Sequence, residues 1–246
     1  MAEIVSLSEF RRNEMSQYGE DGIIKEIFLR IGISSRFCFE AGAWNGFHFS
    51  NTAKLWNEQE WSAILVEKDA SRAAECIDNT SSVKHNRVVV LNQEISHSNG
   101  IDSILQRYSH GELLDFLSLD IDGNEWHVLN AMRHMPRVIC VEYNPTMPPH
   151  IEMVGSIDRG IGASLQAFKS LLWPTYTLVY ATEVNAFLVL SQYSHLFRAF
   201  DPVEVVRYNM LDYMISDYAG RRMKYWANAY GRQDDLLPSF FTRIEQ

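Results

Sequence analysis

Short apolar runs alternate along most of the chain with segments whose apolar residues recur at helical spacing. The runs predicted as strands are Phe37–Phe39, Ser62–Val66, Val88–Leu91, Phe116–Leu119, Val138–Val141, Tyr176–Tyr180 and Ala186–Leu190. Helices are expected over Ile23–Ile31, Ser50–Trp56, Ile101–Tyr108, Glu125–His134 and Ala163–Leu172. Apolar strands separated by helices are typical of a parallel sheet with both faces covered. The link between the last two runs is too short for a crossover, so we expect an antiparallel pair at the sheet edge.

Four acidic residues occupy equivalent places in this pattern, directly after the apolar part of a predicted strand. They are Glu40, Glu67, Asp120 and Glu142. A single acid at a strand end is more often a helix cap or a solvated loop residue. Four of them in one parallel sheet converge on the crevice at the carboxyl ends of the strands, where ligands bind. We therefore expect the functional site at this edge.

The turn after the first strand indicates the kind of ligand. Gly42 and Gly46 have the spacing Gly-x-x-x-Gly and precede a segment of helical character. Glycines between a strand and a helix let the backbone approach a nucleotide-like ligand. The pyrophosphate of a dinucleotide needs the tighter Gly-x-Gly-x-x-Gly turn and a free helix N-terminus, so the spacing favours S-adenosylmethionine. Glu67 then accepts hydrogen bonds from the ribose hydroxyls.

Further polar residues are candidates for contact with the same cofactor. Gln17 and Tyr18 precede the first predicted helix and are placed to fold over the methionine end. Ser50 and Asn51 lie where a helix begins and are equally suited to cap that helix. Glu94 follows the third strand, where an adenine contact is expected in this fold.

A second group of oxygen-bearing side chains predicts a metal site. Asp120 and Asp122 form a pair after the fourth strand, and Glu142 and Asn144 follow the neighbouring strand. Oxygen ligands suit a hard divalent cation such as Mg²⁺ or Mn²⁺. We expect Asp120, Glu142 and Asn144 to be the ligands, although Asp122 is equally suited to hold the start of the next helix.

Composition narrows the class of protein. The 246 residues are enough for one domain with elaborations, and 46% are hydrophobic and 22% charged, as in soluble globular proteins. No apolar run reaches the length of a membrane span, and no signal pattern opens the chain. A net charge of −9 without a basic stripe argues against a nucleic-acid partner. Three cysteines, two within apolar runs, fit buried thiols in a reducing cytoplasm.

Several of these motifs together resemble FkbM-like S-adenosylmethionine-dependent methyltransferases. The matching segments are Ser16–Gly22, Glu40–Gly42, Leu65–Glu67, Asp115–Asn124, Val141–Pro145, Gly162–Leu165 and Val184–Phe187. The resemblance implies a Rossmann-like class I methyltransferase fold, α/β, with seven mostly parallel strands in the order 3-2-1-4-5-7-6. It also implies a role in biosynthesis, because the acids after strands four and five are similar to those of metal-dependent sugar O-methyltransferases of antibiotic biosynthesis. Those enzymes carry two aspartates after strand five, where this chain has Glu142-Tyr143-Asn144.

Methyl transfer to a hydroxyl suggests which groups do chemistry. The acceptor must lose its proton, which requires a base, a metal that lowers the hydroxyl pKa, or both. Asp122 is the first candidate for the base, and His127, about one helical turn further on, is the second. His48, in the loop after Gly46, is a candidate for contact with the cofactor carboxylate or the acceptor.

The resemblance fades after residue 196. We assign residues 1–196 to the methyltransferase domain and 197–246 to a helical C-terminal extension of it, rich in aromatic residues and methionine. Packing against the sheet or a second subunit is one interpretation of this extension, and a lid over the substrate is the other. Acceptor choice is expected to lie in Thr146–Gly160, a proline-rich loop, and in Phe197–Tyr230.

Three function classes remain open. The first is a small-molecule O-methyltransferase acting on a sugar or natural product. The second is a nicotinamide-dependent oxidoreductase on the same fold, although the third glycine and a Tyr-x-x-x-Lys pair are missing. The third is a scaffold protein that keeps the cofactor pocket without turnover, although three converging acids have no use in a scaffold. A hydrolase is excluded, because the chain has no Gly-x-Ser-x-Gly elbow.

Overall fold

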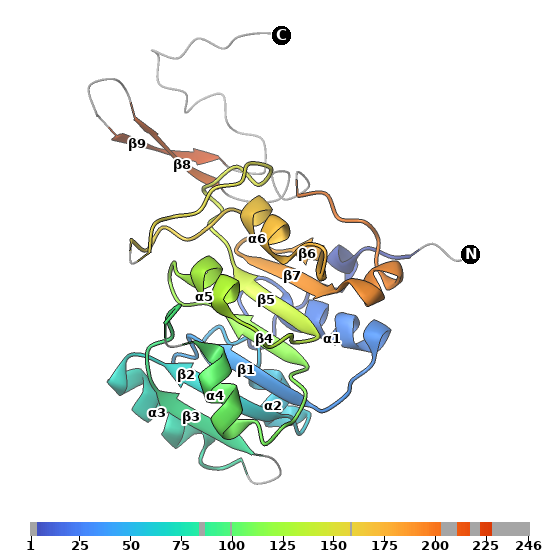
Figure 1. Cartoon of the computed structure of the whole chain (residues 1–246), viewed down its shortest axis with the longest axis vertical. Helices are drawn as coiled ribbons and strands as arrows, with labels where there is room; N and C mark the ends of the chain where they lie inside the picture. Colours follow the sequence, from blue (N-terminus) through green and yellow to red (C-terminus); the bar gives the residue numbers. More distant parts are fainter. Residues whose placement is uncertain are drawn as a thin grey trace.

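The computed structural model describes residues 4–83, 87–98, 100–157, 159–202, 211–216 and 222–227. Seven strands form one sheet in the order β3-β2-β1-β4-β5-β7-β6, which confirms the predicted order (Figure 1). The strands are β1 Phe37–Ala41, β2 Ser62–Glu67, β3 Val88–Asn92, β4 Phe116–Leu119, β5 Val138–Glu142, β6 Tyr176–Ala181 and β7 Asn185–Leu190. All seven predicted strands are therefore present, with ends shifted by two residues at most.

Strand directions change at one side of the sheet, where the last two strands lie. The first five strands pair in parallel, whereas β7 pairs antiparallel with both β5 and β6. The expected antiparallel pair is confirmed, and the strand that runs against the others, β7, lies one place in from the edge. Because β7 enters the sheet from the carboxyl ends of the parallel strands, its first residue, Asn185, lies beside Glu142, the last residue of β5.

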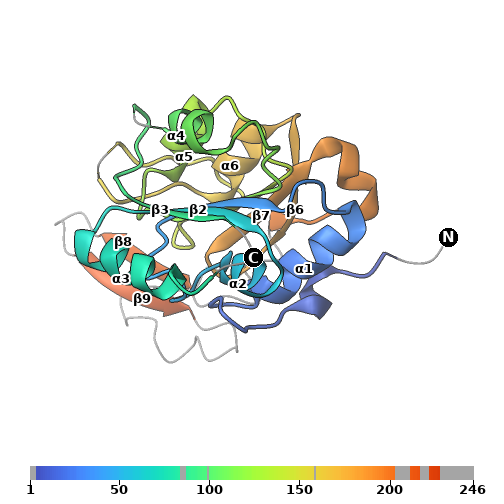
Figure 2. The ribbon, with the colours of Figure 1, turned by 90° about the horizontal axis from the view of Figure 1, so that it is seen from below.

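Two layers of helices cover the sheet. The helices are α1 Glu20–Ile31, α2 Ala53–Glu58, α3 Ala70–Thr80, α4 Ile101–Tyr108, α5 Glu125–Ala131 and α6 Leu165–Leu172, with short 3-10 turns η1 Leu7–Phe10 and η2 Ser191–Leu196. Figure 2 shows α4, α5 and α6 on one face and α1, α2 and α3 on the other. Each face buries its own apolar cluster against the sheet. This arrangement explains why the strands are apolar throughout instead of alternating.

The first helix shows how the apolar pattern produces the local structure. Ile23, Ile24, Ile27, Phe28 and Ile31 are buried and recur at the spacing of one helix face. The helix ends at Gly32, whose φ of 72° an L side chain rarely adopts. The predicted helix is therefore confirmed together with its C-terminal boundary.

One helix was not predicted. α3 buries only Ala73, Cys76 and Thr80, which are small residues, so it lacks the large apolar side chains that mark the other helices in the sequence. Its start is nevertheless marked by Asp69, whose side chain accepts a hydrogen bond from the Arg72 N–H at 2.9 Å. The Asp69 cap is thus the signal in the sequence that marks this helix.

The prediction of a helical C-terminal extension is wrong for two segments. β8 (Leu211–Ser216) and β9 (Arg222–Ala227) are strands that pair antiparallel with each other. The rest of the extension beyond Pro202 lies outside the described residues, and the domain boundary at residue 196 stays a prediction. Tyrosine and methionine at mixed spacing fit a strand as well as a helix, because aromatic residues favour strands.

Among the residues that the structure describes, no helix combines the length and apolar character that a membrane crossing requires.

Candidate active site

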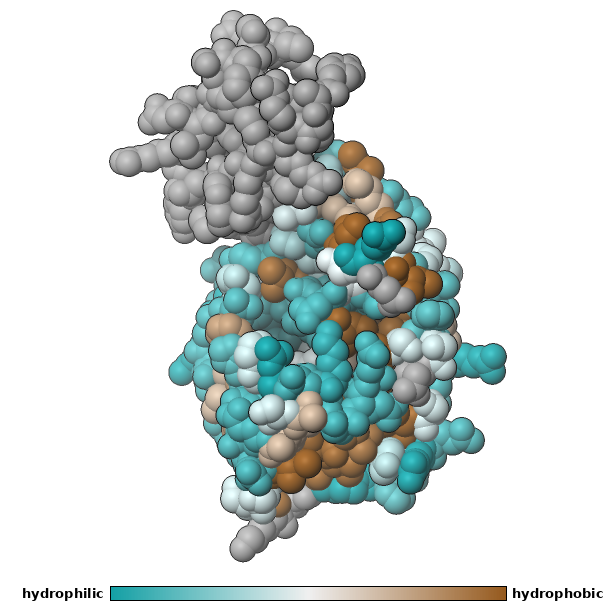
Figure 3. Space-filling view, turned by 90° about the vertical axis from the view of Figure 1, so that its left-hand side faces the viewer, coloured by the Kyte–Doolittle hydropathy of each residue, from teal (hydrophilic) through white to brown (hydrophobic). Residues whose placement is uncertain are grey.

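The predicted acids meet along one row at the carboxyl edge of the sheet. Paired residues form a row across five strands: Val66, Ala41, Leu119, Val141 and Ala186. One step further toward the carboxyl edge lie Glu67, Gly42, Asp120, Glu142 and Asn185. The row thus carries three acids and an amide with a glycine between them. The carboxyl ends lie at the left in Figure 1, and Figure 3, which views the molecule from that side, shows a largely hydrophilic surface.

A pocket of about 420 Å³ opens above this row. Its described lining includes ten of the residues predicted from the sequence: Gln17, Glu40, Gly42, His48, Asn51, Glu67, Glu94, Asp120, Asp122 and Glu142. A smaller pocket of about 250 Å³ adjoins it, with Asp122, Glu142 and Gly160 lining both. Tyr18, Gly46, Ser50 and His127 are absent from the described lining of either pocket. Most of the predicted residues therefore lie together at this edge of the sheet.

Gly42 makes room at the centre of the row. Its φ is 82°, and a Cβ built there would lie 1.6 Å from the main-chain oxygen of Asp120. Its N–H donates to the carbonyl of Val66 at 2.9 Å. Any side chain here would collide with the backbone that carries Asp120, so glycine is required for β1 and β4 to end side by side.

Glu67 is 4% exposed, yet it lines the pocket. One carboxylate oxygen accepts the Trp44 N–H at 2.9 Å, and the other accepts the Asp69 N–H at 2.8 Å. These two main-chain donors hold the carboxylate in place, and each of its oxygens retains a lone pair. The group is therefore fixed in position and able to accept hydroxyl donors from a ligand.

Glu40 is as enclosed as Glu67, at 4% exposure. Its carboxylate accepts hydrogen bonds from Ser50 Oγ (2.6 Å), Thr52 Oγ1 (2.6 Å) and the Asn51 N–H (2.9 Å). Burial nevertheless raises the pKa of Glu40 to about 7. Ser50 Oγ also accepts the Ala53 N–H at 2.9 Å, so its hydroxyl caps α2, the second of its two predicted roles. Asn51 lines the pocket and donates to Ser118 Oγ at 3.1 Å.

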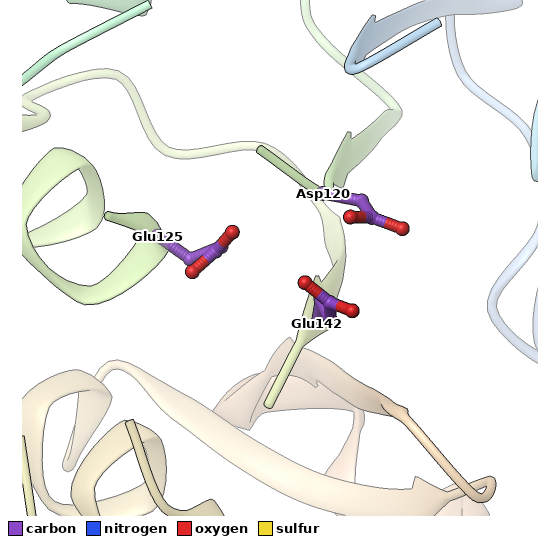
Figure 4. Close-up of side chains that lie close together, drawn as sticks. All are labelled: Asp120, Glu125 and Glu142. Carbon is purple, nitrogen blue, oxygen red and sulfur yellow. The ribbon is translucent and has the colours of Figure 1, made fainter. Parts of the chain in front are cut away.

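Three carboxyl groups face one another at the far end of the pocket (Figure 4). Asp120, Glu125 and Glu142 each offer an oxygen, and these oxygens lie within 4.8 Å of one another. Burial and the charge of Asp120 raise the pKa of Glu142, and burial raises the pKa of Asp120 while the hydrogen bond with Glu142 lowers it. Two of the three, Asp120 and Glu142, are predicted metal ligands. The crowding of like charges favours either a shared proton or a bound cation.

The third predicted metal ligand, Asn144, does not belong to this cluster. Its Nδ2 donates to the Ile161 carbonyl at 2.6 Å, while its Oδ1 accepts from the N–H and the hydroxyl of Thr146. Both ends of the amide thus hold the loop after β5. Glu125, which the sequence analysis missed, lies in the cluster instead, and its Oε1 accepts the N–H groups of Ile121 and Gly123 at 2.9 Å. Glu125 belongs to a turn-capping pattern as well, which is why its sequence position did not suggest a ligand.

The two candidate bases differ in placement. Asp122 lines both pockets, has a φ of 62° and an 81% exposed side chain, and lies 3.7 Å from Lys68 Nζ. His127 points elsewhere, because its Nε2 lies 2.9 Å from the Gly155 carbonyl oxygen. Of the two, the structure places only Asp122 at the pockets.

The rim of the pocket contains aromatic and basic side chains that the sequence analysis did not assign. Trp44 (38% exposed) and Phe49 (52% exposed) flank His48, with ring centroids 4.6 and 4.0 Å from the imidazole. The Arg72 guanidinium lies over the Trp44 ring, 3.6 Å from its centroid. His48 lines the pocket, as expected, and Lys68 directly follows Glu67. Proximity to the glycine turn was the available signal for Trp44.

Two isoleucines give the pocket an apolar wall, and the sequence analysis missed both. Ile95 is buried, and Ile121 packs against the core on the α4–α5–α6 face. Both line the pocket near Glu94 and Asp122 in sequence. An apolar wall beside an acid is a suitable surface for a heterocyclic base.

The motif Ser16–Gly22 acts mainly as a support. Asp21 Oδ2 accepts the N–H groups of Glu14, Met15 and Ser16, each at 2.8 Å, and Ser16 Oγ at 2.8 Å. Tyr18 donates its N–H to Glu20 and accepts Nε2 of Gln17 at its hydroxyl. These bonds order the chain before α1 and leave Gln17 at the pocket. Tyr18 therefore supports a pocket residue without lining the pocket.

Comparisons with known proteins concern the fold. No family model and no curated protein matches the sequence. Among solved structures, the chain is similar to a SAM-dependent methyltransferase from Aquifex aeolicus, at 10% identity, over 75% of this chain and 95% of that one, with a TM-score of 0.43. It is also similar to the N-terminal domain of EvdMO1 with SAH bound (9% identity, 74% and 82% covered, TM-score 0.46). It is similar as well to the citrinin polyketide synthase CMeT domain, at 12% identity, with a TM-score of 0.47. The match covers 70% of this chain and 51% of that one, so the chain spans about half of that protein. At these levels of similarity, the functional conclusion is drawn from the site.

Proposed function

We propose that the protein is an S-adenosylmethionine-dependent methyltransferase of the FkbM-like kind, which methylates a hydroxyl of a sugar or natural product. One observation carries the proposal: Gly42 separates the buried Glu67 from Asp120 in a single row beneath the main pocket. Glu67 offers a fixed carboxylate for a ribose, Gly42 has no side chain that would obstruct the centre of the row, and Asp120 adds an acid at the other end. A ligand with a nucleoside at one end and a reactive group at the other fits this order.

Residues of the main pocket divide between the parts of this cofactor. Glu67 accepts the ribose hydroxyls, since its carboxylate is held by two main-chain donors and has lone pairs left. Ile95 and Glu94 border the adenine, and Gln17 and Gly42 border the methionine part. When bound, the sulfonium supplies an electrophilic methyl group, and the chain contributes mainly by aligning the two reactants.

The adjoining smaller pocket is the proposed acceptor site. Asp122 lies between the two pockets and is mostly exposed, so its carboxylate is free to take the proton of an acceptor hydroxyl. Gly160 and Ile161, at the end of the proline-rich loop Thr146–Gly160, line this pocket. That position supports a role of the loop in acceptor choice. The segment Phe197–Tyr230, also predicted to take part in acceptor choice, lies largely outside the described part of the chain.

The donor set at the acidic end fits a divalent cation. Three oxygens from Asp120, Glu125 and Glu142 lie within 4.8 Å of one another, and hard cations such as Mg²⁺ and Mn²⁺ prefer such ligands. A cation there would supply positive charge that lowers the pKa of an acceptor hydroxyl. Asp120 and Glu142 would hold it, and Asp122 would remain the base.

Native mass spectrometry of the freshly purified full chain tests the proposal. S-adenosylhomocysteine and NAD⁺ are added together at equal concentration, and the bound mass is read directly. We expect the adenosylhomocysteine complex alone. A complex with NAD⁺ would favour an oxidoreductase, and binding of neither nucleoside would contradict the proposed function. The same spectra give the oligomeric state.

A further inference from the structure

Asn185 contains a buried acceptor without a partner in the described part of the chain. It is the first residue of β7, the paired neighbour of Glu142 on β5, and lines the main pocket together with Asp120 and Glu142. The residue is 5% exposed. Its Nδ2 donates to Glu20 Oε1 at 3.2 Å, whereas its Oδ1 makes no hydrogen bond there and is shielded from solvent.

The direction of the Asn185 amide is fixed by Glu20. A carboxylate only accepts hydrogen bonds, so the NH₂ end of the amide must face Glu20 and the oxygen must point away from it. Glu20 itself is held by the Tyr18 N–H (2.6 Å) and by Thr182 Oγ1 (2.8 Å). The motif before α1 therefore determines where the Asn185 oxygen lies.

The surroundings of this oxygen lack a positive charge. Asp120, Glu125 and Glu142 each bring a carboxyl oxygen within 4.8 Å of the others. Among the described residues of the main pocket, the cationic side chains are Lys68 and Arg72. Lys68 lies against Asp122 and Arg72 over Trp44, on the β2–α3 side. A buried acceptor without a donor is unfavourable, and a cation bound between these groups would satisfy the oxygen and the carboxylates together.

We propose that the Asn185 Oδ1 is a ligand of a divalent cation, together with the carboxylates of Asp120 and Glu142. Asp120 directly follows β4, Glu142 ends β5 and Asn185 begins β7, so the three residues lie in one row at the ends of adjacent strands. Two carboxylates and one amide carbonyl form an oxygen set of the kind that Mg²⁺ and Mn²⁺ take. Asn185 replaces Asn144 in the predicted set, because both ends of the Asn144 amide hold the loop after β5. The proposal rests on the proposed function for the purpose of the cation, while cation binding is measurable without any cofactor.

Mn²⁺ alone is titrated into the full chain, and free Mn²⁺ is followed by its electron paramagnetic resonance signal. We expect saturable binding of one Mn²⁺ to the wild type and a loss of affinity of about tenfold or more in Asn185→Ala, since even outer contacts change metal affinity by that amount. Asp120→Asn should abolish binding. Should Asn185→Ala fail to fold, Asn185→Ser gives the same expected loss, because its shorter hydroxyl keeps a donor near Glu20 and withdraws the oxygen from the carboxylates.

Asn144→Ala serves as the control, because it removes the ligand predicted from the sequence, whose amide holds the loop after β5. This variant should bind Mn²⁺ as the wild type does. The proposal is overturned if the wild type binds no Mn²⁺, if Asn185→Ala keeps full affinity, or if Asn144→Ala loses as much affinity as Asn185→Ala. A titration with S-adenosylhomocysteine in the same samples reports on the proposed function separately.

Discussion

Gly42 follows the central strand β1, and its backbone lies close to the backbone of Asp120, which follows the neighbouring strand β4. Replacing it with alanine would place a methyl group 1.6 Å from the Asp120 carbonyl oxygen at a φ of 82°. We expect Gly42→Ala to lower the free energy of unfolding by about 3 kcal/mol or more, through both the collision and the backbone strain.

A matched substitution separates these two causes. Gly111 has a φ of 79°, and a Cβ added there would meet no atom within 4 Å, so Gly111→Ala should cost only the strain, about 1–2 kcal/mol. Both values are read from urea unfolding. Equal losses in the two variants would show that close approach at Gly42 is unimportant.

Glu40 should make stability depend on pH. Burial raises its pKa from 4.5 to about 7, so the folded protein binds a proton more tightly than the unfolded chain. The resulting stabilisation is complete below pH 4.5 and is lost as pH rises through 7, an effect of roughly 3 kcal/mol. Urea unfolding at several pH values should give a steeper decline for the wild type than for Glu40→Gln. Parallel pH profiles would mean that folding leaves the pKa of Glu40 unchanged.

At the scale of single residues, the sequence located the acids better than their partners. Glu40, Glu67, Asp120 and Glu142 share one signal, the end of an apolar strand, and all four line the pocket. Asn144 and His127 were chosen by proximity in sequence, but both are turned toward nearby loops by hydrogen bonds. Asn185 comes from a strand whose approach depends on the sheet order, so sequence distance gave no indication of it. Glu125 lies close to Asp120 in sequence, but its position is that of a turn-capping residue and did not suggest a ligand.

At the scale of elements, the two edges of the sheet use acids differently. Asp115, just before β4, is fully buried at the amino edge, where it accepts the N–H groups of Ser34, Ser35 and Arg36 and pairs with Arg137 at 2.8 Å. Arg137 is 6% exposed and also donates to the carbonyls of Ile31 and Gly32. The acid that begins the segment Asp115–Asn124 is thus structural, whereas the acid after the same strand belongs to the pocket.

Asp115→Ala should therefore affect stability and spare the ligand site. Removing one partner leaves the Arg137 charge buried and unpaired, which typically costs about 3–5 kcal/mol, an order-of-magnitude value for broken buried pairs. Unfolding by urea measures the loss, and calorimetric titration with S-adenosylhomocysteine, on samples that remain folded, should give wild-type affinity. A selective loss of affinity at unchanged stability would contradict this division between the edges.

The sequence predicted the elements that bury many large apolar side chains and missed a helix that buries few. The seven strands and the helices α1, α4, α5 and α6 have strong apolar patterns, and all were found. α3 buries only small residues and was missed, and β8 and β9 were taken as helical because their aromatic residues recur at mixed spacing. Whether such a segment forms a helix or a strand depends on the parts of the chain that pack against it, which the sequence alone does not reveal.

At the scale of the whole molecule, the strand order brings the site together. Glu67, Gly42, Asp120, Glu142 and Asn185 lie at the ends of five strands that are adjacent in the sheet but spread over most of the described chain. The order itself was predictable through the family resemblance. The pairing of Asn185 with Glu142 was not, because it depends on the register of an antiparallel strand.

The central claim is that this row binds S-adenosylmethionine with Glu67 on the ribose. Calorimetric titration of S-adenosylhomocysteine into the wild type and Glu67→Gln tests it most directly. Loss of a charged hydrogen-bond acceptor should weaken binding by about 1–3 kcal/mol, roughly 5- to 150-fold, in samples that thermal unfolding shows to be folded. Equal affinity in the two proteins, or no binding to the wild type, would contradict the account.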